Sequence, residues 1–212
     1  MLAAGGPHVV DDAGIVAPGH CELESYGNVG PDGAWRFVVS PTCAFRALGN
    51  FEIGLIAAAE GPPGIHVIPG VAVKTGLGHI DLGVSRSVAF AAEISAGFDP
   101  ESNQLDTIST NIPISVHLVS WLELHGNVGL DFEPRNAGIP TYGLAALVEP
   151  VAGWQLVGEV AGRRGFSTRT QWGVRRSTDA FDFDVMYSRS IDDSTRGNWL
   201  TFGVTRRFGH RW

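Results

Sequence analysis

Apolar and polar side chains alternate with a period of two along most of this chain. The clearest example is the segment 121–132, whose two faces carry Leu122, Leu124, Val128, Leu130 and Phe132 on one side and Trp121, Glu123, His125, Asn127 and Asp131 on the other. A period of two is the repeat of a β-strand that is half-buried on one face. The pattern recurs from about residue 19 to the last residues without an intervening helical stretch, and it predicts an all-β protein.

The alternation and the turn residues between its segments predict about twelve strands. Their expected ranges are 19–28, 34–45, 50–60, 65–77, 86–98, 107–118, 121–132, 140–149, 154–163, 168–178, 181–190 and 198–208. The region 77–87 stays open, because residues 80–84 could extend the fourth strand or form a short strand of their own. An even number of strands is expected of a closed bacterial membrane barrel with both termini in the periplasm.

The connections between the expected strands fall into two classes. Those at 46–49, 119–120, 150–153 and 178–180 are short, whereas those at 61–64, 100–106, 133–139 and 192–197 are longer and richer in turn formers and charge. Short periplasmic turns and longer outer loops are typical of outer-membrane barrels. We therefore predict a transmembrane antiparallel up-and-down β-barrel over residues 19–212, located in the bacterial outer membrane. Residues 1–18 lack the strand pattern and are expected to insert into the lumen, to lie at the periplasmic mouth or to form a disordered tail.

The direction in which the apolar face points separates a membrane barrel from a soluble one. A soluble barrel would bury this face, but side chains fill the interior of only about eight strands, and about twelve enclose more space. Aromatic residues such as Trp35, Phe98 and Trp154 stand at the expected strand ends, as in the interfacial girdles of membrane barrels. The apolar face is therefore predicted to contact lipid, and the charged face to line the lumen.

Ionisable side chains on the inward face form the candidate site. The residues expected to line or constrict the lumen are Arg36, Glu52, Lys74, Glu93, His117, Glu123, His125, Glu159, Arg169 and Arg175. Acids fall mainly on odd-numbered strands and many bases on even-numbered ones, so neighbouring strands would place acid beside base, about 5 Å apart at the backbone. Such pairs would let the inward face tolerate partial desolvation. Two interpretations stay open: a constriction that selects permeants by charge and size, or a structural network that lines a largely occluded lumen.

The two cysteines, Cys21 and Cys43, lie symmetrically about the turn cluster at 28–33. A hairpin about that turn would place them opposite each other on the outward face, with Cβ atoms about 4.5–5.5 Å apart. A small adjustment would then allow a disulfide, which indicates an oxidising compartment. The alternative is a pair of free, lipid-facing cysteines that act as small hydrophobes.

Composition and charge narrow the classes of function. The formal net charge of −7 and the pI of about 5.4 argue against a nucleic-acid partner. No apolar run approaches the roughly 18 residues of a membrane helix, although a barrel strand needs only about ten. The histidines are too scattered for a metal motif, so neither a metal nor another cofactor is expected. Leu2, Ala3 and Ala4 could be the remnant of a leader cleavage site.

Several short motifs resemble one family of outer-membrane proteins. The run from Pro7 to Glu24 contains Asp11-Asp12-Ala13 and Pro18-Gly19-His20, followed by Glu22-Leu23-Glu24. It is similar to the opening of the outer-membrane transporters associated with the meta-pathway of phenol degradation, and the segments 71–74, 154–160 and 199–208 add weaker similarities. The resemblance spans nearly the whole chain. It implies a single-chain barrel that takes up small, often aromatic, compounds, and it transfers no catalytic or binding residues.

The last strand also resembles the signal by which the barrel-assembly machinery recognises outer-membrane proteins. Gly203 is followed by residues at fixed steps that end in Phe208, although Arg206 stands where an aromatic residue is more usual and the chain continues past Phe208. The partners that follow are the assembly machinery and outer-membrane lipid. Lipopolysaccharide is a further expected partner, for which the basic pair Arg163-Arg164 is a candidate contact.

The sequence thus predicts a passive channel for a small solute with a charged lumen. One alternative is a non-conducting scaffold barrel that anchors a protein partner through its loops or outer wall, where Pro41, Pro69 and Pro113 could open the strand pairing locally. A more remote alternative is a lipid hydrolase that uses His117 or His125 with a nearby serine or Glu123. Residues two apart on a strand are about 6.5–7 Å apart, too far for direct proton transfer, so no enzymatic activity is expected.

Overall fold

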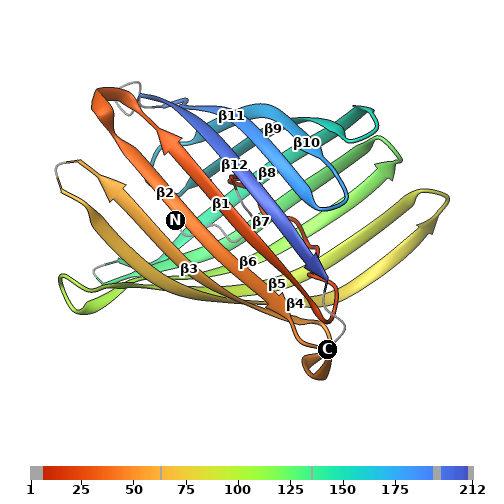
Figure 1. Cartoon of the computed structure of the whole chain (residues 1–212), viewed down its shortest axis with the longest axis horizontal. Helices are drawn as coiled ribbons and strands as arrows, with labels where there is room; N and C mark the ends of the chain where they lie inside the picture. The colour runs from red at the N-terminus through yellow and green to blue at the C-terminus, as the bar shows by residue number, and fades with distance from the viewer. Residues whose placement is uncertain (1–6, 63, 135, 193–196, 210–212) are drawn as a thin grey trace.

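The computed structural model describes residues 7–62, 64–134, 136–192 and 197–209. They form a closed barrel in which each strand pairs antiparallel with its neighbours in the chain and the first pairs with the last (Figure 1). The strands are β1 (His20–Val29), β2 (Trp35–Ala44), β3 (Phe51–Gly61), β4 (His66–Gly83), β5 (Arg86–Asp99), β6 (Gln104–Val119), β7 (Leu122–Glu133), β8 (Asn136–Val151), β9 (Trp154–Arg163), β10 (Arg169–Ser177), β11 (Phe181–Ser190) and β12 (Asn198–Gly209). Among these residues no helix is long and apolar enough to cross a membrane.

The predicted antiparallel barrel is confirmed, and most strand ends lie within a residue or two of those expected. The open region 77–87 belongs to β4, which continues to Gly83 and turns back into β5 at Arg86. A β-bulge between Gly76 and Gly78 interrupts the pairing with β5, and such bulges bend a strand without ending it. The leader remnant expected at residues 2–4 lies outside the described residues.

Strand β3 shows how the alternation is used in space. Its outward residues Phe51, Ile53 and Leu55 are exposed, Leu55 at 59% of its surface, whereas the intervening Glu52 and Ile56 are buried. Apolar groups therefore form the outer wall, whereas the interior holds ionisable groups such as Glu52 and also an apolar cluster of Tyr26, Val38, Ile56, Ala58, Ile68 and Ala72. This is the arrangement that lipid outside and a filled or hydrated lumen inside require.

The two ends of the barrel differ. At one end β1 begins and β12 finishes, and most turns there are tight; we call it the terminal end. The opposite end carries the connections that follow β1, β3, β5, β7, β9 and β11, and we call it the loop end. If short turns face the periplasm, the loop end is the extracellular one.

The disulfide predicted between Cys21 and Cys43 is present. The two residues are directly opposed in the β1–β2 register, with a Cα–Cα distance of 4.1 Å, and they lie on the outward face near the terminal end. The bond therefore links the first two strands next to the seam where β1 pairs with β12.

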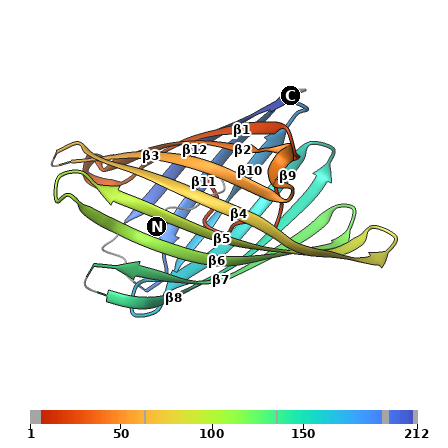
Figure 2. The same ribbon diagram turned by 90° about the horizontal axis from the view of Figure 1, so that it is seen from below.

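The β4–β5 hairpin projects beyond the neighbouring turns at the terminal end, as Figure 1 and Figure 2 show from two directions. Residues 77–86 are exposed on both faces. Ile80 pairs with Val88 on the side that continues the outer wall, and Leu82 and Val84 follow it. The apolar wall is therefore taller on this side of the barrel.

The three prolines within strands do not coincide with the register shifts. Pro69 and Pro113 stand opposite Ala57 and Asn127 in ladders whose register continues through them. The shifts lie elsewhere, as at Gly97–Phe98 in the β5–β6 ladder. The pairing is nevertheless interrupted beside two of the prolines: the β2–β3 ladder has no pairs between Val39–Ala57 and Thr42–Gly54, around Pro41, and the β5–β6 ladder has none between Phe90–Ile114 and Glu93–Asn111, around Pro113. The β3–β4 ladder continues through Pro69.

Candidate functional site

Residues 7–18 run inside the barrel, and we call them the lumen segment. They form no regular secondary structure, so their buried backbone groups need partners from the wall. Asn127 supplies two: its Oδ1 accepts from the Asp11 N–H at 2.7 Å, and its Nδ2 donates to the Asp11 carbonyl at 2.8 Å. The Ala13 N–H donates to Ser115 Oγ at 2.7 Å, and the Val16 N–H to Glu52 Oε2 at 2.7 Å. The wall therefore holds this segment at several heights.

A buried ion pair anchors the middle of the lumen segment. Lys74 Nζ lies 3.0 Å from Asp11 Oδ2 and 3.8 Å from Asp12 Oδ1, and both Lys74 and Asp11 side chains are 7% exposed. Lys74 also stands opposite Glu52 on β3 and Glu93 on β5 in the strand register. One ammonium group thus sits among four carboxyl groups, two from the wall and two from the segment.

His8 anchors the far end of the lumen segment. Its Nδ1 lies 3.1 Å from Glu159 Oε1 and its Nε2 lies 3.5 Å from Asp184 Oδ1. Burial and the Arg175 guanidinium disfavour protonation, but the carboxylates of Asp184 and Glu159 outweigh them and raise the pKa of His8 to about 9. His8 therefore carries a positive charge at neutral pH.

Apolar contacts complete the fit. Val10 is 3% exposed and packs in a cluster with Ala145, Leu147, Val157, Ala161 and Met186. Two wall glycines make room for the segment: a Cβ on Gly143 would lie 2.9 Å from Val10 Cγ2, and one on Gly203 would lie 2.7 Å from Pro7 Cγ. Gly203, which the sequence assigns to the assembly signal, thus also faces the lumen segment. Phe208 stands opposite Cys21, beneath the guanidinium of Arg206 at 4.6 Å.

The ten residues predicted to line the lumen fall at three heights. Glu52, Lys74, Glu93, His125, Glu159 and Arg175 lie around the lumen segment. Arg36 and Arg169 lie toward the loop end, where Arg36 NH1 is 3.7 Å from Glu60 Oε2. His117 and Glu123 lie at the terminal end, 3.2 Å apart. The set does not form a single ring.

Expected pairs between neighbouring strands occur in several places. Arg175 Nε lies 2.8 Å from Asp184 Oδ1, and Arg207 pairs with Asp182. The partners of the lumen segment, Asn127, Ser115 and Gln171, are absent from the predicted set. Their inward positions follow from the alternation, but no signal in the sequence couples them to residues more than a hundred positions away.

The register also brings Ser115 and His125 together, which the sequence did not predict. They are directly opposed on β6 and β7, and Ser115 Oγ lies 2.8 Å from His125 Nδ1. His125 Nε2 lies 3.8 Å from Glu123 Oε1, beyond hydrogen-bond distance. Ser115 is buried and accepts the Ala13 N–H, so in this arrangement it positions the lumen segment and does not meet a substrate.

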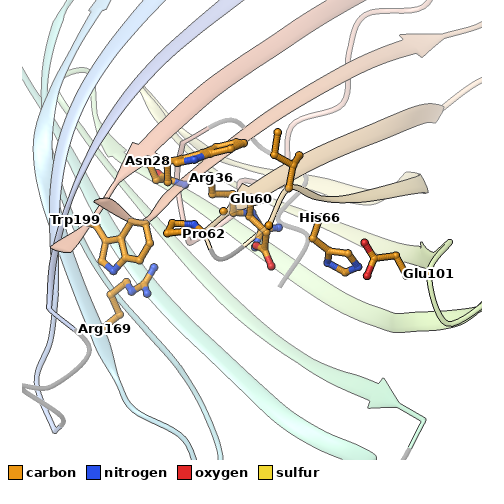
Figure 3. Close-up of a pocket in the computed structure, with 12 residues that line it drawn as sticks. Asn28, Arg36, Glu60, Pro62, His66, Glu101, Arg169 and Trp199 are labelled. Atoms are coloured by element: carbon orange, nitrogen blue, oxygen red, sulfur yellow. The ribbon is translucent and has the colours of Figure 1, made fainter. Parts of the chain in front are cut away.

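Cavities lie on both sides of the lumen segment. At the loop end an opening of about 560 Å³ is lined by Arg36, Arg169 and Trp199 among others, and Figure 3 shows these side chains with Asn28 and Glu60 around it. A second cavity of about 310 Å³ borders Pro7, His8 and Val9. On the terminal side a cavity of about 210 Å³ is lined by Asp11, Asp12, Glu22, Glu24, Glu52 and Lys74. Among the described residues no group of three or more His, Cys, Asp or Glu side chains could hold a metal ion.

Comparison with solved structures shows the fold. The chain resembles the KdgM porin (TM-score 0.67, 9% identity, 88% of this chain and 99% of that one) and the NanC porin (TM-score 0.65, 9% identity, 87% and 98%). It also resembles the COG4313 outer membrane channel from Pseudomonas putida F1 (TM-score 0.58, 10% identity, 93% and 98%). With the apolar outer wall, this fold places the chain in the bacterial outer membrane.

None of these descriptions names the phenol meta-pathway, and no curated protein matches the chain. A family model does match, over residues 1–208, nearly the full length of the chain. Its description carries no activity. The chain therefore belongs to the family described as uncharacterised conserved protein UCP029691.

Proposed function

We propose that this protein is an outer-membrane channel for a small solute, and that the lumen segment closes it in the state described here. Passage then requires residues 7–18 to move. The observation that carries the proposal is the separation of a loop-end cavity from a terminal-end cavity by a segment that only non-covalent contacts hold in place.

The chemistry of the inward face supports a hydrated path. Buried carboxylates, guanidinium groups and amides line the lumen beside and below the segment. Once the segment left, Asn127, Ser115 and Lys74 would each lose a partner that water can replace at small cost. A polar wall of this kind suits diffusion of a polar solute, whereas a barrel built only for anchoring needs no such lining.

The nature of the solute is part of the proposal. The resemblance to transporters of the phenol meta-pathway favours small aromatic compounds, and the cavities are large enough for a single ring. No energy coupling, metal or cofactor is required for such passive passage. The predicted contacts with lipopolysaccharide and with the assembly machinery remain predictions alongside it.

One observation favours the scaffold alternative, because an occupied lumen is also what a non-conducting barrel would show. The two functions differ in what happens when the segment is released. A channel conducts, whereas a scaffold stays closed or loses its fold.

A disulfide lock tests the proposal. The pair Ala13→Cys and Ser115→Cys joins positions whose backbone N and side-chain oxygen are 2.7 Å apart. In planar bilayers we expect no openings from the oxidised double variant and discrete openings after reduction. The unmodified protein in the same reductant controls for loss of the Cys21–Cys43 bond.

A variant that lacks residues 7–17 provides the second arm of this test, and we expect it to conduct continuously. If the folded deletion variant and the reduced double variant both remain closed, the channel proposal is wrong and the scaffold function stands.

A further inference from the structure

The cavity of about 310 Å³ at the loop end lies directly against the lumen segment. Pro7, His8 and Val9 form its floor, and β1, β2, β9, β10, β11 and β12 contribute its walls. It shares Asn28, Arg36 and Arg169 with the larger opening above it (Figure 3). A solute that enters from the loop end would therefore reach this cavity before it meets the closing segment.

The cavity is basic. Arg36, Arg163, Arg169 and the His8 imidazole line it, and none of its described lining residues is a carboxylate. Acids from outside the lining pair with three of these groups: Glu60 lies 3.7 Å from Arg36, Asp131 and Glu133 pair with Arg163, and Glu159 and Asp184 lie beside His8. Guanidinium groups held in this way still have N–H donors for a further acceptor, because each carries five.

The cavity on the terminal side has the opposite character. Its lining includes five carboxyl groups, from Asp11, Asp12, Glu22, Glu24 and Glu52, against the single ammonium of Lys74. The chain as a whole carries a net charge of −7, so a cavity lined by basic groups at the loop end differs in sign from the protein's overall charge. The difference in charge between the two cavities favours an anion as the ligand of the loop-end cavity.

The remaining lining suits a small organic molecule better than a bare ion. Hydroxyl groups of Tyr26 and Ser188 offer neutral hydrogen bonds, and the Phe166 ring offers an apolar surface. Gln171 Nε2 already donates to the Pro7 carbonyl and to Glu159, and Thr201 Oγ1 donates to Asn28. A volume near 300 Å³ is at the lower end of the range for small-molecule sites. Several cations beside a few neutral donors are what recognition of a carboxylate requires.

We propose that this cavity binds a small organic carboxylate, and that it is the recognition site for the solute of the channel. The inference rests on the proposed function in naming the solute class, but the binding site itself can exist without conduction. Because the floor consists of the lumen segment, a bound carboxylate contacts the closing element directly.

Isothermal titration of the full-length barrel in a non-ionic detergent tests this site with three probes: benzoate, the neutral analogue benzamide and the cation benzylammonium. We expect saturable one-to-one binding of benzoate and none of the other two at the same concentration. Arg169→Gln and Arg36→Gln should each weaken benzoate binding about 10- to 100-fold, the usual effect of losing a charge-assisted hydrogen bond. Arg46→Gln is the matched control, because Arg46 is exposed in η2 (Arg46–Leu48) at the terminal end; it should leave the affinity unchanged.

Equal binding of benzoate and benzamide would overturn the inference, as would equal weakening by Arg46→Gln and Arg169→Gln. The heat-dependent shift of the barrel on a gel shows that each variant is folded before it is titrated. The binding experiment and the conductance experiment can fail separately. Benzoate binding without conductance would reject the channel function but not this site, and conductance without benzoate binding would reject this site but not the channel function.

Discussion

Replacing Lys74 by methionine should release the lumen segment. The substitution keeps a long apolar stem but removes the ammonium group that lies 3.0 Å from Asp11 and 3.8 Å from Asp12. Glu52 and Glu93 flank the same position in the register, so the closed state would be left with buried carboxylates and no cation among them.

The size of the effect follows from burial. Both Lys74 and Asp11 are 7% exposed, and removing one partner of a buried ion pair costs about 3–5 kcal/mol. In the open state water solvates these groups, so the cost falls mainly on the closed state. Since about 1.4 kcal/mol changes an equilibrium tenfold, the ratio of open to closed channels should rise by roughly two to three and a half orders of magnitude.

Two readouts measure this change. One is the open probability in planar bilayers, and the other is the rate at which a membrane-impermeant maleimide labels Ala13→Cys in the same background. Lys74→Arg should change little because it keeps the charge. The double variant Lys74→Met with Asp11→Asn should recover part of the closed population, since it removes both charges of the closest pair but leaves Asp12, Glu52 and Glu93 without the cation. If Lys74→Met alters neither open probability nor labelling, the ion pair does not hold the segment and the reasoning is refuted.

Three further predictions follow from other contacts. His8 has a raised pKa of about 9, so its ion pair with Glu159 is fully formed below the ordinary pKa of about 6.5 and is lost as pH rises through about 9. The open probability of the channel should therefore increase between pH 8 and 10, and His8→Gln should remove that increase. Gly143→Val should clash with Val10 and increase the rate of maleimide labelling of the lumen segment. The β-strand content measured by circular dichroism should not change. Cys43→Ala should lower the free energy of unfolding by roughly 3 kcal/mol in urea titrations, the loop-closure value for a separation of 22 residues, and reductant should then have no additional effect.

The wall of this barrel was predictable because a single periodicity governs it. Most of each strand follows the alternation between lipid and lumen, so most strand ranges and the directions of side chains such as Leu55 and Glu52 follow from the sequence. Opposed positions in a hairpin follow from its turn, as for Cys21 and Cys43. The end of β4 did not follow, because the bulge near Gly76 and Gly78 breaks the repeat.

The interior was less predictable, because its contacts do not depend on any local pattern. Asn127 forms a hydrogen bond with Asp11, which lies 116 positions away in the sequence. The contact requires both residues to lie at the same height along the barrel axis, and the alternation of apolar and polar residues does not encode that height. Lys74 was expected to pair with acids on neighbouring strands, yet its close contacts are with Asp11 and Asp12 of the lumen segment. The Ser115–His125 contact required the β6–β7 register, which one strand alone cannot supply.

The projecting β4–β5 hairpin has a consequence for how the barrel sits among lipids. Its exposed residues Ile80, Leu82 and Val84 lie past the level where the other hairpins at this end have already turned (Figure 1). A belt of unequal height cannot match a flat bilayer, and each ångström of mismatch costs a fraction of a kcal/mol. The barrel should therefore tilt so that this hairpin lies among the headgroups, and its axis should not stand perpendicular to the membrane plane.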